Sequence, residues 1–313
     1  MADEKKRLLT GLQPSGQLHI GNYFGVLKPF VDMYAKYESF LMVADYHSLT
    51  SLKDPAQVRQ NTIDVVKDYI AVGVDPTKAV IFKQSDVSEH TEMAWIFECL
   101  VTVPFLELSH AYKDKVAKGM EANAGLFNYP MLMAADILLY DTAVVPVGQD
   151  QQQHVEYARE AAAKFNNTWG QTFIEPAEMI LAGVGTVPGT DGKKMSKSYK
   201  NTIPLFGTKE EIAAAVARIV TDSSGEIPQN VYQIHKLFSP HVDALYEANK
   251  GKYKQLKDML VADIDGIVGP MREKRAAITD ADVATILADG AAKAKAIASQ
   301  KMSDVRKKVG VSL

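Results

Sequence analysis

The sequence predicts an α/β protein: a Rossmann-like, doubly wound parallel sheet followed by an all-helical C-terminal region. Short apolar runs alternate with helical patterns through the first part of the chain, as expected for buried parallel strands joined by helices. Beyond Pro204, Ala-rich helical patterns follow one another without the alternation that is typical of strands. A chain of 313 residues is long enough for two domains.

The first part of the chain contains four expected strands. They cover residues 7–11, 39–45, 79–85 and 143–147. Helical spacing of apolar residues covers 21–37, and a long helix is expected over 55–71, with Asp54 as its N-cap and Pro55 at its first position. Ligands of doubly wound folds bind at the carboxyl ends of the strands, where this chain places several polar residues. These residues are Gln13, Asp45, His47, Gln84 and Ser85.

The second part of the chain is expected to be helical throughout. Its helical patterns cover 210–219, 241–248, 253–264, 266–278 and 280–308. We expect a possible break in the last of these near Gly290, because glycine is a poor helix former.

The bulk composition excludes several classes of protein. Cys99 is the only cysteine, which excludes an intramolecular disulfide, a multi-cysteine zinc site and an all-cysteine iron–sulfur cluster, and we expect no protein-held metal site. Residues 1–7 lack an apolar signal core behind them, and no uncharged run could span a membrane, so a cytoplasmic location is expected. The net charge of −3 argues against indiscriminate nucleic-acid binding, and DNA is not an expected partner.

A glycine-containing segment near the start, residues 13–22, has the features of an anion site. It reads as a strand end, a tight turn and the opening of a helix, whose free N–H groups and dipole favour anions. His19 and Asn22 are three residues apart and would share a helix face, and Gly16 and Gly21 would allow close approach of a nucleotide. The alternative is a structural helix start capped by Ser15.

A second segment, residues 193–198, is a dense cationic loop. Lys193, Lys194 and Lys197 crowd three positive charges into five positions, a repulsive arrangement that an anion would relieve. Met195 is the only apolar residue of the loop. A solvated basic loop is the alternative interpretation, but the two segments together suggest a clamp that stabilises a departing pyrophosphate.

These two segments together resemble the paired signatures of class I aminoacyl-tRNA synthetases. The first reads His-Ile-Gly-Asn, where the more common form ends in a second His, and the second, Lys-Met-Ser-Lys-Ser, is a full match. Residues 11–16, 128–140 and 145–154 are in turn similar to segments of the tryptophanyl-tRNA synthetase family. The resemblance runs from about Leu8 to Ser198 and continues more weakly through the helical part.

The resemblance implies a tryptophan–tRNA ligase that uses ATP and Mg²⁺. Such an enzyme activates L-tryptophan to the adenylate with release of pyrophosphate, and then transfers tryptophan to tRNA(Trp). It further implies a homodimer, with interface helices around residues 105–160. The domains would be a catalytic domain over 1–203, a helical anticodon-binding domain over 204–289, and a C-terminal helix over 290–313 that packs back on the catalytic domain.

One carboxylate, that of Asp136, indicates where the amino-acid substrate would bind. Asp136 comes after an apolar, Met-rich segment, and a buried carboxylate requires a donor, which an indole N–H could supply. The resemblance assigns this role to Asp136, places Met133 against the ring, and gives Tyr129 and Gln151 the α-amino group. For Asp136, a helix cap or core salt bridge is the alternative. His47 is evenly balanced between pocket wall and loop packing, and His154 is expected to have a structural role near Gln151.

The resemblance also implies the nucleotide site. Gly148, Gln149 and Asp150 would bind the ribose and adenine, with backbone contacts from Val184. His19, Asn22, Lys194 and Lys197 would act in catalysis by holding the phosphates. The full ATP set is Gln13, Pro14, Ser15, Gly21, Asn22, Gly148, Gln149, Asp150, Val184, Lys194, Met195, Ser196, Lys197 and Ser198.

Two local departures from the family pattern and three alternative functions remain. Leu9 stands where many relatives carry an aromatic residue, and residues 199–201 stand where many have an Asp-Pro pair. A tyrosyl-tRNA synthetase would need polar partners for a phenol deep in the pocket. A catalytically dead paralogue that binds RNA or senses amino acids would lose the phosphate-binding lysines or the pocket carboxylate. A small-molecule nucleotidylyltransferase would leave the long helical part unexplained.

Overall fold

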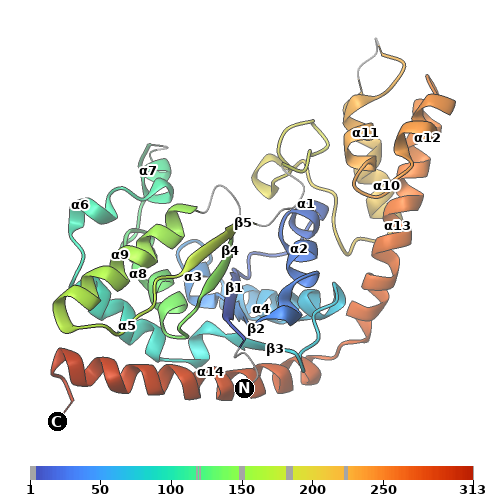
Figure 1. Cartoon of the computed structure of the whole chain (residues 1–313). Helices are drawn as coiled ribbons and strands as arrows, with labels where there is room; N and C mark the ends of the chain where they lie inside the picture. Colours follow the sequence, from blue (N-terminus) through green and yellow to red (C-terminus); the bar gives the residue numbers. More distant parts are fainter. Residues whose placement is uncertain are drawn as a thin grey trace.

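The computed structural model describes residues 5–117, 119, 121–147, 152–180, 186–221 and 225–312. Its centre is a parallel five-stranded sheet with the order β3-β2-β1-β4-β5 (Figure 1). The strands are β1 (Arg7–Leu12), β2 (Glu38–Val43), β3 (Ala79–Lys83), β4 (Val144–Val147) and β5 (Ala177–Ile180). The predicted doubly wound sheet with a helical C-terminal region is therefore confirmed, and β5 is a strand that the sequence analysis did not identify.

Neighbouring residues of each strand point to opposite faces of the sheet, and each face has its own core. Leu8 and Leu41 belong to one apolar cluster, whereas Leu9 and Phe40, the residues beside them in sequence, belong to the other. The first cluster continues into the helices of residues 209–277 and the start of the last helix, and the second is completed by helices from residues 89–169 and by residues 294–305 of the last helix. Because both faces are covered, the strands are apolar runs, which explains why the sequence pattern identified them.

The helices of the first part cover both faces of the sheet. They are α1 (Ile20–Asn22), α2 (Lys28–Val31), α3 (Asp45–Ser48), α4 (Pro55–Ala71), α5 (Glu89–Glu98), α6 (Val103–Leu106), α7 (His110–Ala117), α8 (Ala124–Leu138) and α9 (Gln152–Trp169). A π-helical turn, η1 (Tyr23–Leu27), joins α1 to α2, and 3₁₀ turns form η2 (Tyr34–Lys36), η3 (Gln84–Asp86) and η5 (Lys197–Tyr199). The predicted start of α4 is confirmed, since the Asp54 side chain accepts from the Ala56 N–H at 2.9 Å.

Two predicted strand ends were too long. The strand expected over 39–45 ends at Val43, and the one expected over 79–85 ends at Lys83. In both cases the chain turns into a short helix, α3 or η3, directly after the last apolar residue. The turn at η3 is what places the Gln84 side chain against the buried site described below.

The second part is helical and contains α10 (Lys209–Ala217), α11 (Gln229–His235), α12 (Val242–Ala248), α13 (Tyr253–Ala277) and α14 (Asp280–Val309). The sequence analysis missed α11 and split α13 into two helices. The expected break near Gly290 is also wrong, because α14 is continuous through this residue. Gly290 lies against the backbone of Ile81, where a Cβ atom would overlap the carbonyl oxygen.

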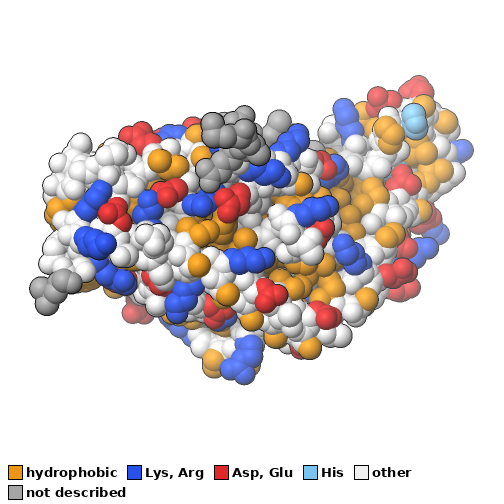
Figure 2. Space-filling model, turned by 60° about the horizontal axis from the view of Figure 1, so that its bottom comes forward, with side chains coloured by type: hydrophobic (Ala, Val, Ile, Leu, Met, Phe, Trp, Pro, Cys, Tyr) orange, Lys and Arg blue, Asp and Glu red, His pale blue; other side chains and the backbone are white. Residues whose placement is uncertain are grey.

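Helix α14 lies along the bottom of the molecule, whereas α10–α13 form an arm beside the sheet (Figure 1). Figure 2, which brings that bottom forward, shows basic and acidic side chains interspersed over the face. Polar contacts to the sheet side hold α14, including Arg306 with Glu92 and Lys301 with Asp141. In the arm, Arg275 of α13 pairs with two carboxylates of α4. No helix in the described part of the chain is long and apolar enough to cross a bilayer.

Candidate active site

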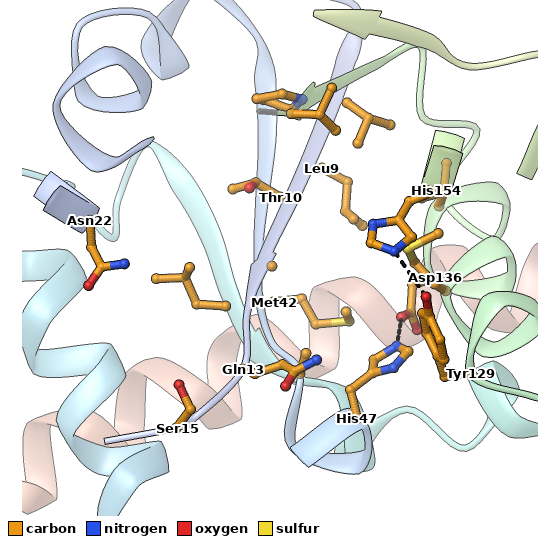
Figure 3. A pocket seen from close by; sticks show the side chains of 18 of the residues that line it. Leu9, Thr10, Gln13, Ser15, Asn22, Met42, His47, Tyr129, Asp136 and His154 are labelled. Carbon is orange, nitrogen blue, oxygen red and sulfur yellow. Dashed lines mark hydrogen bonds and ion pairs between the residues drawn. The ribbon is translucent and has the colours of Figure 1, made fainter. Parts of the chain in front are cut away.

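A cavity of about 500 Å³ opens where the strand order changes direction, between β1 and β4. Residues 9–13 of β1 and its carboxyl end form one wall, and residues 145–147 of β4 form the other. Crevices at such a switch point are the usual ligand sites of doubly wound sheets. Figure 3 shows Ser15 and Asn22 toward one end of this cavity and His47, Tyr129, Asp136 and His154 toward the other.

The second of these ends combines an apolar wall with one carboxylate. Met133 and Asp136 both come from α8, where a spacing of three residues places them on one helix face. Leu9 and Met42 of the sheet complete the apolar wall, so Leu9 does occupy the pocket position that the sequence analysis had flagged. An aromatic ring with a single polar edge matches this combination of walls.

The Asp136 carboxylate is buried and bound by three side chains. His47 Nε2 lies 2.8 Å from Oδ2, and His90 Nδ1 lies 2.6 Å from Oδ1. Gln84 Nε2 donates to both oxygens, at 2.8 and 3.0 Å. Asp136 therefore lies at the expected pocket position and also belongs to a buried polar cluster, because it lines the cavity and contacts two histidines.

These partners keep Asp136 ionised. Burial by itself opposes ionisation of the carboxyl, but the hydrogen bonds from His47 and His90 outweigh it and lower its pKa to about 2. His47 thus belongs to the pocket wall as well as to the carboxylate network. The cavity holds a negative charge on a largely apolar surface.

Tyr129 extends the same end of the cavity. Its hydroxyl lies 3.2 Å from Ser109 Oγ and 3.1 Å from His154 Nε2, and burial raises its pKa. His154, which was expected to be only structural, lines the cavity together with Tyr129. A neutral phenol held by two partners is a fixed polar group beside the apolar wall.

The other end of the cavity is built on the turn from β1 into α1. His19 is the N-cap of α1: its Nδ1 accepts from the Asn22 N–H at 3.3 Å, while Asn22 Oδ1 accepts from the His19 N–H at 3.0 Å. The cap is thus His19 and not Ser15. This reciprocal capping box leaves His19 Nε2 and Asn22 Nδ2 as donors, so an Asn serves here where a second His is more common.

The His19 ring is neutral at pH 7. Burial, and secondarily the nearby charge of Lys197, lowers its pKa to about 4. Gly21 leaves room for this ring, because a Cβ there would approach His19 Nδ1 to 2.9 Å and Met195 to 3.3 Å. The glycine therefore permits the close packing of the turn against the Lys loop.

The Lys loop is anchored by one apolar and one amide side chain. Met195 is buried in the core, as its apolar character predicted. The buried Asn201 amide accepts from the Ser196 N–H at 2.8 Å and donates to the Lys194 carbonyl at 3.1 Å. Asn201 therefore anchors the loop, a role that was not predicted from the sequence.

The loop meets the turn through Lys197. Its ammonium donates to the Ser15 and Gly16 carbonyls at 3.2 and 3.0 Å, and burial lowers its pKa. On the other side of the turn, Asn61 of α4 donates to the Pro14 carbonyl at 2.9 Å. The turn that was predicted to bind phosphate is thus fixed from both sides by side chains distant in sequence.

The structure brings together both predicted halves of the site. The predicted residues that line the cavity are Gln13, Ser15, His19, Asn22, His47, Tyr129, Met133, Asp136, Ser196 and Lys197. Pro14, Gly21, Lys194, Met195 and Ser198 belong to the two flanking segments without being in that lining. Gly148, Gln149, Asp150, Gln151 and Val184 lie outside the described residues.

Two buried residues of this site escaped the sequence analysis altogether. His90 sits near the start of α5, and Tyr140 lies just past the end of α8, in segments that read as ordinary core. Gln84 was noted at a strand end but without a role. His90 and Gln84 are far from Asp136 in the sequence, so no local spacing marks them, whereas Tyr140 lies four residues after Asp136 and is linked to it through His90.

Comparison with known proteins places the chain in a family. The model of the class I tRNA synthetases for tryptophan and tyrosine (W and Y) matches residues 1–284. A tryptophan–tRNA ligase of Fusobacterium nucleatum is 47% identical, with 98% of each chain covered, and one of Campylobacter jejuni is 43% identical over 97% of this chain and all of the relative.

Solved structures agree with the sequence relatives. The tryptophanyl-tRNA synthetase of Campylobacter jejuni in complex with ADP and tryptophan superposes with a TM-score of 0.92 at 43% identity, covering 97% of this chain and 99% of that one. The Mycoplasma pneumoniae enzyme gives a TM-score of 0.86 at 31% identity, with 98% of each chain covered. The chain belongs to the class I aminoacyl-tRNA synthetases, in the family of tryptophan–tRNA ligases.

Proposed function

We propose that the cavity between β1 and β4 is where this ligase activates L-tryptophan, with Asp136 as the acceptor for the indole N–H. The observation that carries this proposal is a buried, ionised carboxylate beside an apolar wall formed by Leu9, Met42 and Met133. A ring with one N–H donor satisfies both the apolar walls and the carboxylate. A phenyl ring offers no donor to the carboxylate, and a site that hydrogen-bonds its substrate discriminates strongly against an analogue without the hydrogen-bonding group.

The remaining predicted pocket residues fit this orientation. Met133 packs on the ring face, and Tyr129 offers its hydroxyl toward the α-amino end of the amino acid. Gln151 is proposed for the same end on the resemblance alone. His47 shapes the pocket wall while it donates to Asp136.

The nucleotide occupies the other end of the cavity in this proposal. Gln13, Pro14, Ser15 and Gly21 form the turn under the phosphates, and His19 Nε2 and Asn22 Nδ2 donate to them. Gly148, Gln149, Asp150 and Val184 are proposed for the ribose and adenine. A relative 43% identical to this chain was solved with ADP and tryptophan together, which supports two neighbouring subsites.

Adenylate formation then needs positioning more than proton transfer. The tryptophan carboxylate is already ionised and attacks the α-phosphorus, while the bond to pyrophosphate breaks and the leaving group takes the electron pair. Lys194, Lys197 and the Met195–Ser198 segment approach the departing pyrophosphate from the opposite side to the turn. Charge placed there stabilises the transition state more than the bound substrate.

Mg²⁺ would enter with the triphosphate. Among the described residues no group of three or more acidic, His or Cys side chains could hold a metal ion, so the ion's oxygen ligands would come from the phosphates and water. When bound, it would neutralise phosphate charge, and the residues named above would orient the substrates.

We also propose the remaining assembly from the family resemblance. Tryptophan would pass to tRNA(Trp), with the arm formed by α10–α13 within 204–289 as the anticodon-binding domain and α14 as the helix that packs on the catalytic domain (1–203). Exposed apolar residues on α6 and near α7, namely Val103, Leu108 and Val116, support a homodimer interface in the 105–160 region. The expected cytoplasmic location stays a prediction.

The test is ATP–pyrophosphate exchange with each of the twenty amino acids. Exchange should depend on tryptophan, and tyrosine-dependent exchange in its place would overturn the proposal. Lys194→Ala should lower the rate of adenylate formation by about 100-fold while tryptophan affinity, measured by calorimetry, changes little. Lys209→Ala removes an exposed lysine from the start of α10 and serves as the matched charge control. Unchanged exchange in Lys194→Ala would refute the role given to the Lys loop.

A further inference from the structure

A buried chain of hydrogen bonds continues behind Asp136, away from the cavity. His90 Nδ1 lies 2.6 Å from Asp136 Oδ1, and His90 Nε2 lies 2.8 Å from the Tyr140 hydroxyl. Both His90 and Tyr140 are 0% exposed, and neither lines the cavity. The two residues therefore cannot contact a ligand, and any influence on binding must pass through Asp136.

The hydrogen bonds define which ring nitrogen of His90 carries the proton. A carboxylate oxygen only accepts, so Nδ1 must carry the proton that it donates to Asp136. Nε2 can then accept from the Tyr140 O–H, and burial raises the pKa of Tyr140, which keeps that proton on the phenol. Tyr140 thus fixes the His90 tautomer that points a donor at the carboxylate.

The Gln84 amide is oriented in the same way. Its Oε1 accepts from the Tyr46 N–H at 3.2 Å, which turns its Nε2 toward Asp136. Asp136 therefore has donors from Gln84, His90 and His47, against about four lone-pair positions on a carboxylate. Gln84 contacts both oxygens, His90 contacts Oδ1 and His47 contacts Oδ2, and the carboxylate that they hold in place lies in the wall of the cavity.

We propose that His90 and Tyr140 are positioning residues that make the cavity selective for a ring bearing an N–H donor. They hold Asp136 ionised and in a fixed orientation at the cavity wall, so that a ring with an N–H gains a hydrogen bond to a charged acceptor that a ring of the same shape without a donor does not gain. The inference rests on the proposed contact between Asp136 and the indole N–H. It adds that two residues that do not touch the substrate, His90 and Tyr140, control this contact through Asp136.

The test compares tryptophan with β-(3-benzothienyl)-L-alanine, in which sulfur replaces the ring N–H. The quantity measured is the ratio of kcat/KM for the two in ATP–pyrophosphate exchange. The wild type should prefer tryptophan by roughly 100-fold, the scale of a hydrogen bond to a charged group. Tyr140→Phe should lower this ratio by about 3- to 10-fold, and His90→Ala by about 10-fold or more, chiefly through tryptophan.

Two further variants separate positioning from simple structural damage. His90→Asn retains a donor close to the position of Nδ1 and should recover part of the ratio that His90→Ala loses. Tyr246→Phe is the matched control, because its buried hydroxyl also pairs with a histidine, His235, but in the arm rather than at the cavity. It should leave the ratio at the wild-type value even if it lowers the free energy of unfolding.

The outcomes distinguish the two proposals. A wild type without preference for tryptophan over the sulfur analogue would overturn the proposed role of Asp136 itself. A wild-type preference that persists undiminished in a folded Tyr140→Phe protein would overturn the positioning role alone. Ring ¹⁵N shifts give an independent check that needs no activity: His90 protonated only at Nε2 would also refute the inference.

Discussion

The molecule contains two Tyr–His–Asp chains, one at the cavity and one in the helical arm. At the cavity, Tyr140, His90 and Asp136 are joined by contacts of 2.8 and 2.6 Å. In the arm, Tyr246, His235 and Asp263 are joined by contacts of 3.2 and 2.8 Å, with the two ring nitrogens exchanged. The Asp136 side chain is 2% exposed, whereas that of Asp263 is 43% exposed.

This difference shows that burial of the carboxylate, and not the residue triplet, makes a site. Water can satisfy the Asp263 carboxylate whenever its partner moves, so little depends on that pair. Asp136 has no such alternative and must be satisfied by Gln84, His47 and His90. The same three residue types thus join helices in the arm, whereas at the cavity we propose that they set up an acceptor for a ligand.

Of the expected differences between the two hydrogen-bonded triplets, the largest is in how a change of the carboxylate affects enzymatic activity. Asp136→Asn replaces the acceptor with an amide whose NH₂ group faces existing donors, and it removes the charge. Tryptophan-dependent exchange should fall by about 100- to 1,000-fold in kcat/KM, whereas Asp263→Asn should change it less than about 2-fold. Equal losses in the two variants would contradict the contrast.

A smaller difference is expected in the pH dependence of stability. The pKa of Asp136 is lowered from 3.8 to about 2, so its ionised form stabilises the folded chain above about pH 4. This contribution, on the order of 2 kcal/mol, is lost as the pH falls from about 4 toward 2. Urea unfolding at pH 6 and pH 3 should therefore show a steeper loss for the wild type than for Asp136→Asn. Parallel pH profiles would mean that the carboxylate is not held ionised by its neighbours.

The smallest effect should come from the arm. Asp263→Asn keeps an oxygen that can face His235 Nε2 and alters a partly exposed ion pair. Its free energy of unfolding at pH 7 should fall by less than about 1 kcal/mol in urea titrations. A loss of several kcal/mol would show that the arm depends on its triplet as much as the cavity depends on Asp136.

The sequence was sufficient to predict structural features that depend on residues close to one another in the chain. Strands β1 to β4 and the Asp54 cap depend on neighbours within a few residues and were predicted, whereas β5 was not, and phosphate binding by residues 13–22 and 193–198 stays a prediction. The continuity of α14 was not predicted either, since Gly290 is a poor helix former by itself and is explained only by its contact with Ile81. His47 was considered as a pocket residue and Gln84 was noted at a strand end, but their contacts with Asp136 were not predicted. His90 was not identified at all. The three residues come from α3, η3 and α5, which only the folded chain brings together.

The contact between Gly290 and Ile81 also bears on the order in which the chain is assembled. Strand β3 is at the edge of the sheet, and α14 packs along it with its backbone in contact. During synthesis, β3 leaves the ribosome about 200 residues before α14 is made. Until then this sheet edge lacks its covering helix and could pair with another chain. The nascent protein therefore exposes this edge throughout the interval between the synthesis of β3 and that of α14.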